Sequence, residues 1–130
     1  MNSNIQLQII NKNINSYNFK LPKEQYYGNK EYKLKLTEKF TENIRLQKFI
    51  TQMQFRLIEG EGKAYYYIGV WDNGEIANTN DEQFKLSFQI ISYSCKSLDA
   101  EINKIYKFSL PNKQYYVFCI SSNINYNFFI

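Results

Sequence analysis

The residues of this chain that could do chemistry are few, and their spacing does not form a familiar catalytic centre. Ser92, Ser94 and Cys95 could act as nucleophiles, but the sequence contains no His to activate them, and the familiar catalytic triads require such a base. Cys95 and Cys119 are the only cysteines, which leaves too few soft ligands for a zinc site. We therefore predict no catalytic centre, no cofactor and no metal.

Acidic side chains stand beside glycines at two places. Asp72-Asn73-Gly74 followed by Glu75 could be taken for a metal-binding or acid–base cluster. Asn-Gly between two strand-like segments instead predicts a type I′ hairpin turn, because both residues tolerate positive φ. Glu59 and Glu61 flank Gly60 at the predicted end of a helix, and we interpret both as solvated, since paired catalytic carboxylates need a shared cleft.

The remaining functional candidates are basic. The net charge is +4, and residues 1–63 carry 11 Lys and Arg against 6 Asp and Glu. A basic surplus can attract phosphate backbones. If a strand over residues 31–36 and the following helix are neighbours, their cations form a shallow basic surface for ribosomal RNA, whereas the alternative is an ordinary lysine-rich solvent face. The candidate surface consists of Lys33, Lys35, Arg45, Lys48 and Arg56.

Two helices are expected to position these residues. Thr37 or Thr41 begins the first helix, which ends at Gly60 because glycine adopts the left-handed C-terminal conformation at little cost. Thr79 and Glu82 form a capping box that begins the second helix. Each helix carries an apolar stripe at core-facing spacing. The stripes are Leu46, Phe49, Ile50, Met53 and Leu57 in the first helix and Phe84, Phe88, Ile91, Cys95 and Leu98 in the second.

Strands are expected between and around the helices. Period-two alternation predicts a strand over residues 31–36, with Tyr32, Leu34 and Leu36 on one face and Lys33 and Lys35 on the other. Aromatic and β-branched residues predict three longer strands and a short return strand after the hairpin turn. These segments are residues 64–71, 75–77, 101–110 and 114–121.

The order of the predicted elements is β-α-β-β-α-β-β. Its first six elements match the ferredoxin-like β-α-β-β-α-β arrangement, with an additional C-terminal strand, so the predicted fold class is α+β. At 130 residues the chain has the length of one domain. We expect residues 1–20 to be an Asn-rich segment that is poorly ordered or forms an edge strand, residues 21–122 to be a single domain, and residues 123–130 to be a tail ending in Phe128-Phe129-Ile130.

Tyrosines are abundant, with 12 in the chain, and several fall in the predicted strands. Tyr65, Tyr66 and Tyr67, or Tyr115 and Tyr116, could stack bases as aromatic residues do on RNA-binding sheets. The glycine–aromatic signature of that module is missing, so packing within the sheet is the preferred interpretation. A stand-alone RNA-binding ferredoxin-like domain is therefore kept as the alternative function.

Three stretches resemble the region ahead of the G domain in the GTP-binding-protein-1/2 family of elongation-factor-like GTPases. The first is LPKEQYYGNKEYKLKL, residues 21–36, and the second is RLQKFITQMQFRLIEGEGKAYYYIGVWDNG, residues 45–74. The third and weaker stretch is the capped helix with the strand start that follows it, residues 79–102. Together they place the resemblance over roughly residues 21–108.

The resemblance implies a domain linked to translation elongation-like activity. The sequence lacks the G-x-x-x-x-G-K-[ST] loop that cradles phosphates, so GTP would be a cofactor only if a longer chain supplied a G domain. The expected role is a non-catalytic accessory domain whose partner is a G domain, the ribosome or ribosomal RNA. With no 18-residue apolar run and no apolar N-terminal stretch, we expect no membrane partner and a cytoplasmic location.

Overall fold

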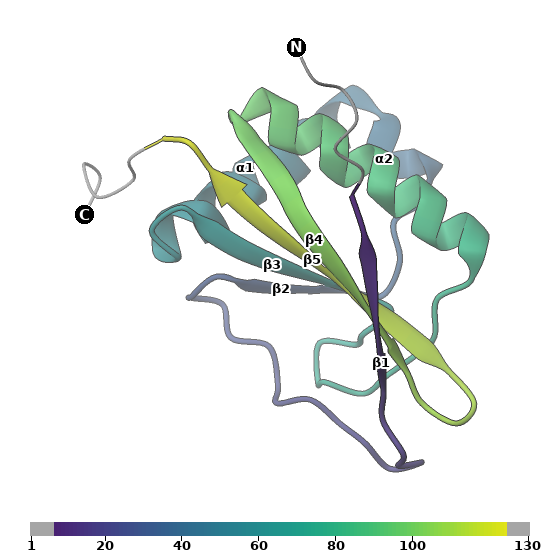
Figure 1. Ribbon diagram of the computed structural model, residues 1–130. Helices are drawn as coiled ribbons and strands as arrows, with labels where there is room; N and C mark the ends of the chain where they lie inside the picture. The colour runs from purple at the N-terminus through teal and green to yellow at the C-terminus, as the bar shows by residue number, and fades with distance from the viewer. Residues whose placement is uncertain (1–6, 125–130) are drawn as a thin grey trace.

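The computed structural model describes residues 7–124, and its fold is α+β. A five-stranded mixed sheet carries two helices on one face (Figure 1). The Phe128-Phe129-Ile130 tail lies outside the described residues. In chain order the elements are β1 (Ile9–Asn13), β2 (Lys30–Lys33), a 3-10 helix η1 (Glu38–Thr41), α1 (Asn43–Glu59), β3 (Lys63–Ile68), α2 (Asp81–Ser97), β4 (Ala100–Ser109) and β5 (Gln114–Ser122).

The strands are ordered β1-β4-β5-β3-β2 across the sheet. β4 and β3 both pair antiparallel with β5, so the crossover through α2 joins two parallel strands with a third strand between them. That split β-α-β unit is the ferredoxin-like feature, and the C-terminal strand occupies its centre. β1 and β2 pair in parallel with β4 and β3 and form the two edges.

The two helices cover one face of the sheet because each presents the predicted apolar stripe to it. Phe49, Met53 and Leu57 of α1 and Ile91 and Cys95 of α2 are buried in one cluster with side chains from the strands. Burial of each such side chain contributes roughly 2 kcal/mol. This layer is the main core of the domain.

A second apolar cluster lies on the opposite face of the sheet. It is built on residues of β2, β3, β4 and β5, and neither helix of the described residues 7–124 contributes to it. The loop that joins β1 to β2 (Figure 1) packs on part of it instead, through Ile14, Phe19 and Leu21. The backbone N–H of Ile14 donates to Ser109 O at 2.8 Å, which fixes the start of that loop beside β4. We call this surface the open sheet face.

The first predicted strand is shorter than expected. β2 ends at Lys33, and alternation stops there: Tyr32 packs in the cluster of the open sheet face while Leu36 is buried beneath the helices. The prediction that Tyr32 and Leu36 share a face was therefore wrong. The chain has to leave the sheet after Lys33 in order to begin η1 at Glu38. Side chains alternate between two faces only within a strand, so the alternation ends at Lys33.

The predicted hairpin turn also differs in detail. Gly74 N donates to Trp71 O at 2.8 Å, and within residues 71–74 only Gly74 has a positive φ, so the turn is not type I′. The Asn73 carboxamide accepts a hydrogen bond from Glu75 N instead. Residues 75–77 add two isolated bridges, Val70 to Ile76 and Lys20 to Glu75, rather than a strand.

The second helix begins one residue later than predicted. Asn80 is the N-cap, and it forms the capping box with Gln83: each side chain accepts a hydrogen bond from the backbone N–H of the other residue, at 2.8 Å and 3.1 Å. Thr79 is buried and donates its hydroxyl to Ile68 O at 3.1 Å. The Thr79–Glu82 capping box was therefore wrong, because the threonine is needed to satisfy a carbonyl at the end of β3.

Candidate interaction surfaces

Arg56 is not part of a solvent-exposed basic surface. Its side chain is only 4% exposed, and its Nε donates to Glu31 Oε1 at 2.8 Å. The other guanidinium nitrogens donate to the carbonyl oxygens of Gln25, Tyr27 and Gly28, each at 2.9 Å. The sequence-based placement of Arg56 on the interaction surface was wrong, because its position on α1 faces the loop before β2 rather than solvent.

The buried Arg56 guanidinium instead holds the chain that leads into β2. Three carbonyl oxygens of residues 25–28 converge on it, and Glu24 lies 3.9 Å from Arg56 Nη2. The Glu24 carboxylate accepts a hydrogen bond from Tyr32 N at 2.6 Å, while burial raises its pKa. The result is a rigid loop, because each buried charge has hydrogen-bonded partners.

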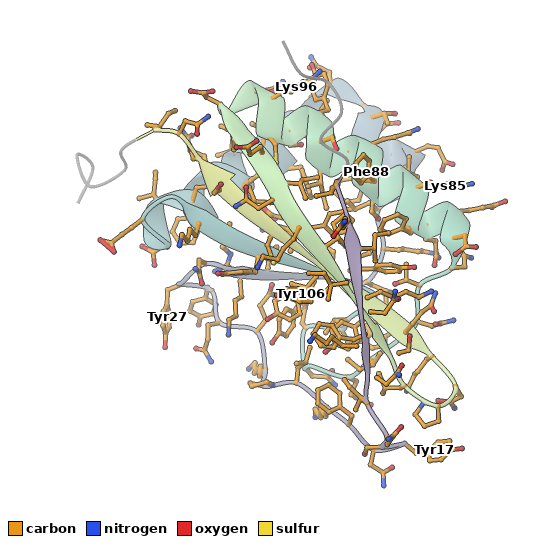
Figure 2. All side chains as sticks on the ribbon, in the orientation of Figure 1. Tyr17, Tyr27, Lys85, Phe88, Lys96 and Tyr106 are labelled. Carbon is orange, nitrogen blue, oxygen red and sulfur yellow. The ribbon has the colours of Figure 1, made fainter. Side chains whose placement is uncertain are left out.

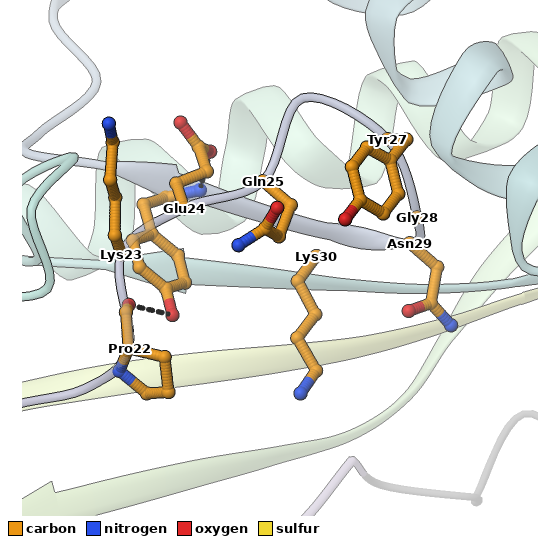
Figure 3. A pocket seen from close by; sticks show the side chains of 9 residues that line it. Pro22, Lys23, Glu24, Gln25, Tyr27, Gly28, Asn29 and Lys30 are labelled. Atoms are coloured by element: carbon orange, nitrogen blue, oxygen red, sulfur yellow. Dashed lines mark hydrogen bonds between the residues drawn. The ribbon is translucent and has the colours of Figure 1, made fainter.

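The same loop encloses a small hollow beside β2. The hollow has a volume of about 210 Å³, and Figure 3 shows the side chains that line it, among them Lys23 and Lys30. The Tyr32 hydroxyl donates to Pro22 O at 2.9 Å and closes one end. Tyr32, which lines the hollow, also belongs to the second cluster.

The other four predicted basic residues are divided between two environments. The Lys33 side chain is 23% exposed, lies 3.5 Å from Glu31 Oε2 and stands over the Phe49 ring. Lys35, Arg45 and Lys48 are exposed, and Arg45 Nε lies 3.4 Å from Glu42 Oε1. A pair that exposed contributes little to stability, so Lys35, Arg45 and Lys48 are available as surface charges.

Lys48 belongs to a mixed apolar and polar surface on the outer side of α1. Ile44 is 71% exposed and Phe55 is 42% exposed. Along one stripe of the helix, Ile44 lies one turn before Lys48 and Phe55 lies two turns after it. A shallow depression joins them. We call this surface the outer α1 face and define it as Ile44, Gln47, Lys48, Thr51, Gln52 and Phe55.

The tyrosines considered as base-stacking residues fall on two faces of the sheet. Tyr66 and Tyr116 are buried under the helices. Tyr65, Tyr67 and Tyr115 lie on the open sheet face. Tyr115 is fully buried there, stacked at 4.9 Å on Phe108, whereas Tyr65 and Tyr67 are half-buried.

Both cysteines are buried core residues, and Cys95 lies on the apolar stripe predicted for the second helix. Burial raises the pKa of the Cys95 thiol to about 12, with a smaller contribution from the negative charge of Glu101. Burial also raises the pKa of Cys119, against the opposing effect of Lys104. Neither thiol is therefore ionised at neutral pH, and neither is a nucleophile there. Within residues 7–124 no three metal-ligand side chains gather at one point.

Sequence reasoning missed the most exposed apolar residues of α1 and the lysines that border the open sheet face. Ile44 and Phe55 lie off the core stripe at a spacing of eleven residues, and that spacing was the available signal. Which face of the sheet carries Lys30, Lys63 and Lys104 depends on how the strands pair. A single sequence does not define that strand register.

Comparison with known proteins gives one relationship. No protein-family model matches the chain. The chain is 39% identical over 82 residues to GTP-binding protein 2 of Mus musculus and, equally, to GTP-binding protein 2 of Homo sapiens. The match covers 63% of this chain but only 13% of each relative. The chain is thus related to a small part of a GTP-binding protein. None of the helices in the described part of the chain has the length and apolarity to cross a bilayer.

Proposed function

We propose that this chain is a non-catalytic interaction domain, equivalent to the region ahead of the G domain in GTP-binding-protein-2-like translational GTPases. The observation that carries this proposal is the 39% identity to GTP-binding protein 2 over 63% of the chain. The absence of a phosphate-binding loop from the sequence supports a role other than GTP hydrolysis. In this proposal the domain acts in the cytoplasm and positions a protein partner.

The outer α1 face is the surface we assign to that protein partner, and the partner is a G domain of the same family. Ile44 and Phe55 supply the exposed apolar contacts, and Lys48 between them supplies a charge. Large apolar side chains that form a contiguous exposed patch mark protein interaction sites more often than scattered ones do. Buried apolar anchors surrounded by polar residues are the usual anatomy of such interfaces.

The test is binding in trans. The purified chain is titrated calorimetrically into mouse GTP-binding protein 2 from which the matching segment has been deleted. We expect saturable binding that Ile44→Glu weakens at least about tenfold, because a charge is then placed at an apolar contact. Lys85→Glu on α2 is the matched control and leaves binding unchanged, since Lys85 is exposed on the other helix.

Nucleotide binding supplies the outcome that would contradict a non-catalytic role. The chain is mixed with a fluorescent GTP analogue under the same conditions. Tight binding or GTP hydrolysis by the chain alone would overturn the proposal. Equal binding of the Ile44→Glu variant and the unmodified chain to the deleted protein would remove the outer α1 face from it.

A further inference from the structure

We propose that the open sheet face binds single-stranded nucleic acid, with bases stacked on Tyr65, Tyr67 and Tyr106 and phosphates held by Lys30, Lys63 and Lys104. This site is separate from the outer α1 face and does not depend on the protein partner proposed there. Figure 2 shows Tyr106 on the sheet and the labelled side chains Lys85, Phe88 and Lys96 along α2. Phe88 packs in the cluster beneath the helices and Tyr106 in the cluster of the open face.

Strand register brings the three tyrosines to one area. Tyr67 and Tyr106 both lie opposite Val117 of β5, one from each side, and Tyr65 lies opposite Cys119. Because β5 separates β3 from β4, the rings of Tyr67 and Tyr106 stand two strand spacings apart, about 10 Å, and Tyr65 and Tyr67 are about 7 Å apart along β3. The buried Val117 and Cys119 form the floor between them.

The three rings are half-buried, and the Tyr67 ring also packs against Tyr32 and Tyr115, with ring centroids 5.0 Å and 6.5 Å apart. Ile14, Phe19 and Leu21 of the loop between β1 and β2 pack on the cluster, and Phe19 stacks on Tyr115, with ring centroids 6.4 Å apart. Tyr115 is fully covered, whereas Tyr65, Tyr67 and Tyr106 keep part of their surface exposed. Aromatic rings on a sheet face offer a flat surface on which any unpaired base can stack.

Lysines border the tyrosines on both sides. Lys30 of β2 pairs with Tyr65, and Lys104 of β4 lies opposite Cys119 in the same row. Lys63 lies opposite Ser121 one row further along. All three lysines are exposed, and Lys104 Nζ stands 5.7 Å from the centre of the Tyr106 ring.

Fewer acidic than basic side chains lie near these tyrosines. Glu101 pairs with Ser121 and so lies in the same row as Lys63, on the other side of β5. Glu24 is directed into the loop by its hydrogen bond from Tyr32 N. Three lysines around aromatic rings match a polynucleotide backbone with unstacked bases, because the cations displace counterions while the rings accept the bases. An acidic peptide would use the lysines but not the row of rings.

The test is fluorescence anisotropy with labelled ten-nucleotide oligomers of uridine and of thymidine, titrated with the full chain at several salt concentrations. We expect binding to one or both oligomers that weakens as salt increases. Tyr65→Leu and Tyr106→Leu each reduce the affinity about tenfold, since one stacking contact is lost. Lys30→Gln lowers the slope of log affinity against log salt by about 0.7, the value for one phosphate contact on a single strand.

The controls separate this site from general charge attraction and from loss of folding. Tyr93→Leu and Lys85→Gln alter exposed residues of α2, and both variants bind as the unmodified chain does. Thermal melting shows that each variant is folded. No binding to either oligomer at 50 mM salt overturns the proposal. Equal affinity for a duplex of the same length overturns it too, because paired bases cannot stack on the rings.

Discussion

The two faces of the sheet bury their apolar side chains in different ways. On the covered face, α1 and α2 bury an apolar layer that contains Phe118, Ile120 and Tyr66. On the open face, a loop packs against Tyr115 through Phe19 and accepts a hydrogen bond from the Tyr32 hydroxyl at Pro22 O. Half-buried tyrosines and exposed lysines lie beside it. The difference shows that one face is used for stability and that the other keeps large side chains partly in contact with solvent.

The loop that half-covers the open face is attached through charge rather than through apolar packing alone. Arg56 reaches from α1 to three carbonyl oxygens of the loop and to Glu31 of β2. A buried ion pair contributes little net stability compared with apolar side chains of the same size, but loss of one partner is costly. The link therefore holds the loop in one position beside the half-buried tyrosines of the open sheet face.

The largest expected effect comes from breaking that link. Arg56→Ala removes the closer of the two cations beside the buried Glu31 carboxylate and leaves only Lys33, 3.5 Å away. It also removes the donor to three loop carbonyl oxygens, and we expect it to reduce the free energy of unfolding by about 3 to 5 kcal/mol. Urea denaturation followed by circular dichroism measures the change. Lys35→Ala is the matched control, and it changes stability by less than about 0.5 kcal/mol because Lys35 is exposed. Equal effects of the two substitutions would contradict the role of Arg56.

An intermediate effect distinguishes the two cysteines, one on each face. Burial raises the pKa of Cys95 from its usual 9.0 to about 12, so the unfolded chain loses the proton first as pH rises. Stability from this group is complete below pH 9 and falls between pH 9 and 12, by about 1.4 kcal/mol at pH 10.

Urea denaturation between pH 8 and pH 10 measures this decline. Cys95→Ala makes the decline smaller by about 1.4 kcal/mol at pH 10. Part of the decline remains, because burial also raises the pKa of tyrosines such as Tyr66 and Tyr67. Cys119→Ala removes less, because Lys104 opposes the effect of burial on the Cys119 pKa. A decline that persists unchanged in Cys95→Ala would show that other groups cause it.

The smallest expected effect concerns the start of α2, which covers the closed face. Asn80→Ala removes the side chain that accepts the Gln83 N–H bond, and the expected loss is about 1 kcal/mol of unfolding free energy. Glu82→Ala is neutral within about 0.5 kcal/mol, since Glu82 is exposed and outside the capping box. Thermal melting of both variants measures the difference, and the reverse order of effects would restore Thr79–Glu82 as the cap.

Sequence periodicity predicted the covered face well, and the reason is local. The stripes that include Met53 and Leu57 in α1 and Ile91 and Cys95 in α2 repeat at the helical period, and all four residues are buried as expected. The α+β, ferredoxin-like class followed from the same pattern. Helical spacing defines a face within a few turns, so no long-range information is needed.

The open face and the buried arginine could not be predicted in the same way. The interaction of Arg56 with Glu31 joins residues 25 apart in sequence, and periodicity does not describe contacts between a helix and a distant loop. Tyr65 and Tyr106 come together only through the register of both their strands on β5. Register depends on which strands pair, and a shift of one residue would move both rings to the covered face.

The most direct test of the contrast between the faces is amide chemical-shift mapping of the ¹⁵N-labelled chain with a ten-nucleotide uridine RNA and, in parallel, its thymidine DNA counterpart. If the open sheet face is the binding surface, the largest shifts for whichever oligomer binds occur at β3, β4 and β5, around Tyr65, Tyr106 and Cys119, while the exposed residues of α2 shift little. Shifts concentrated on α1 or α2, or no shifts with either oligomer at 50 mM salt, would contradict the assignment of nucleic-acid binding to this face.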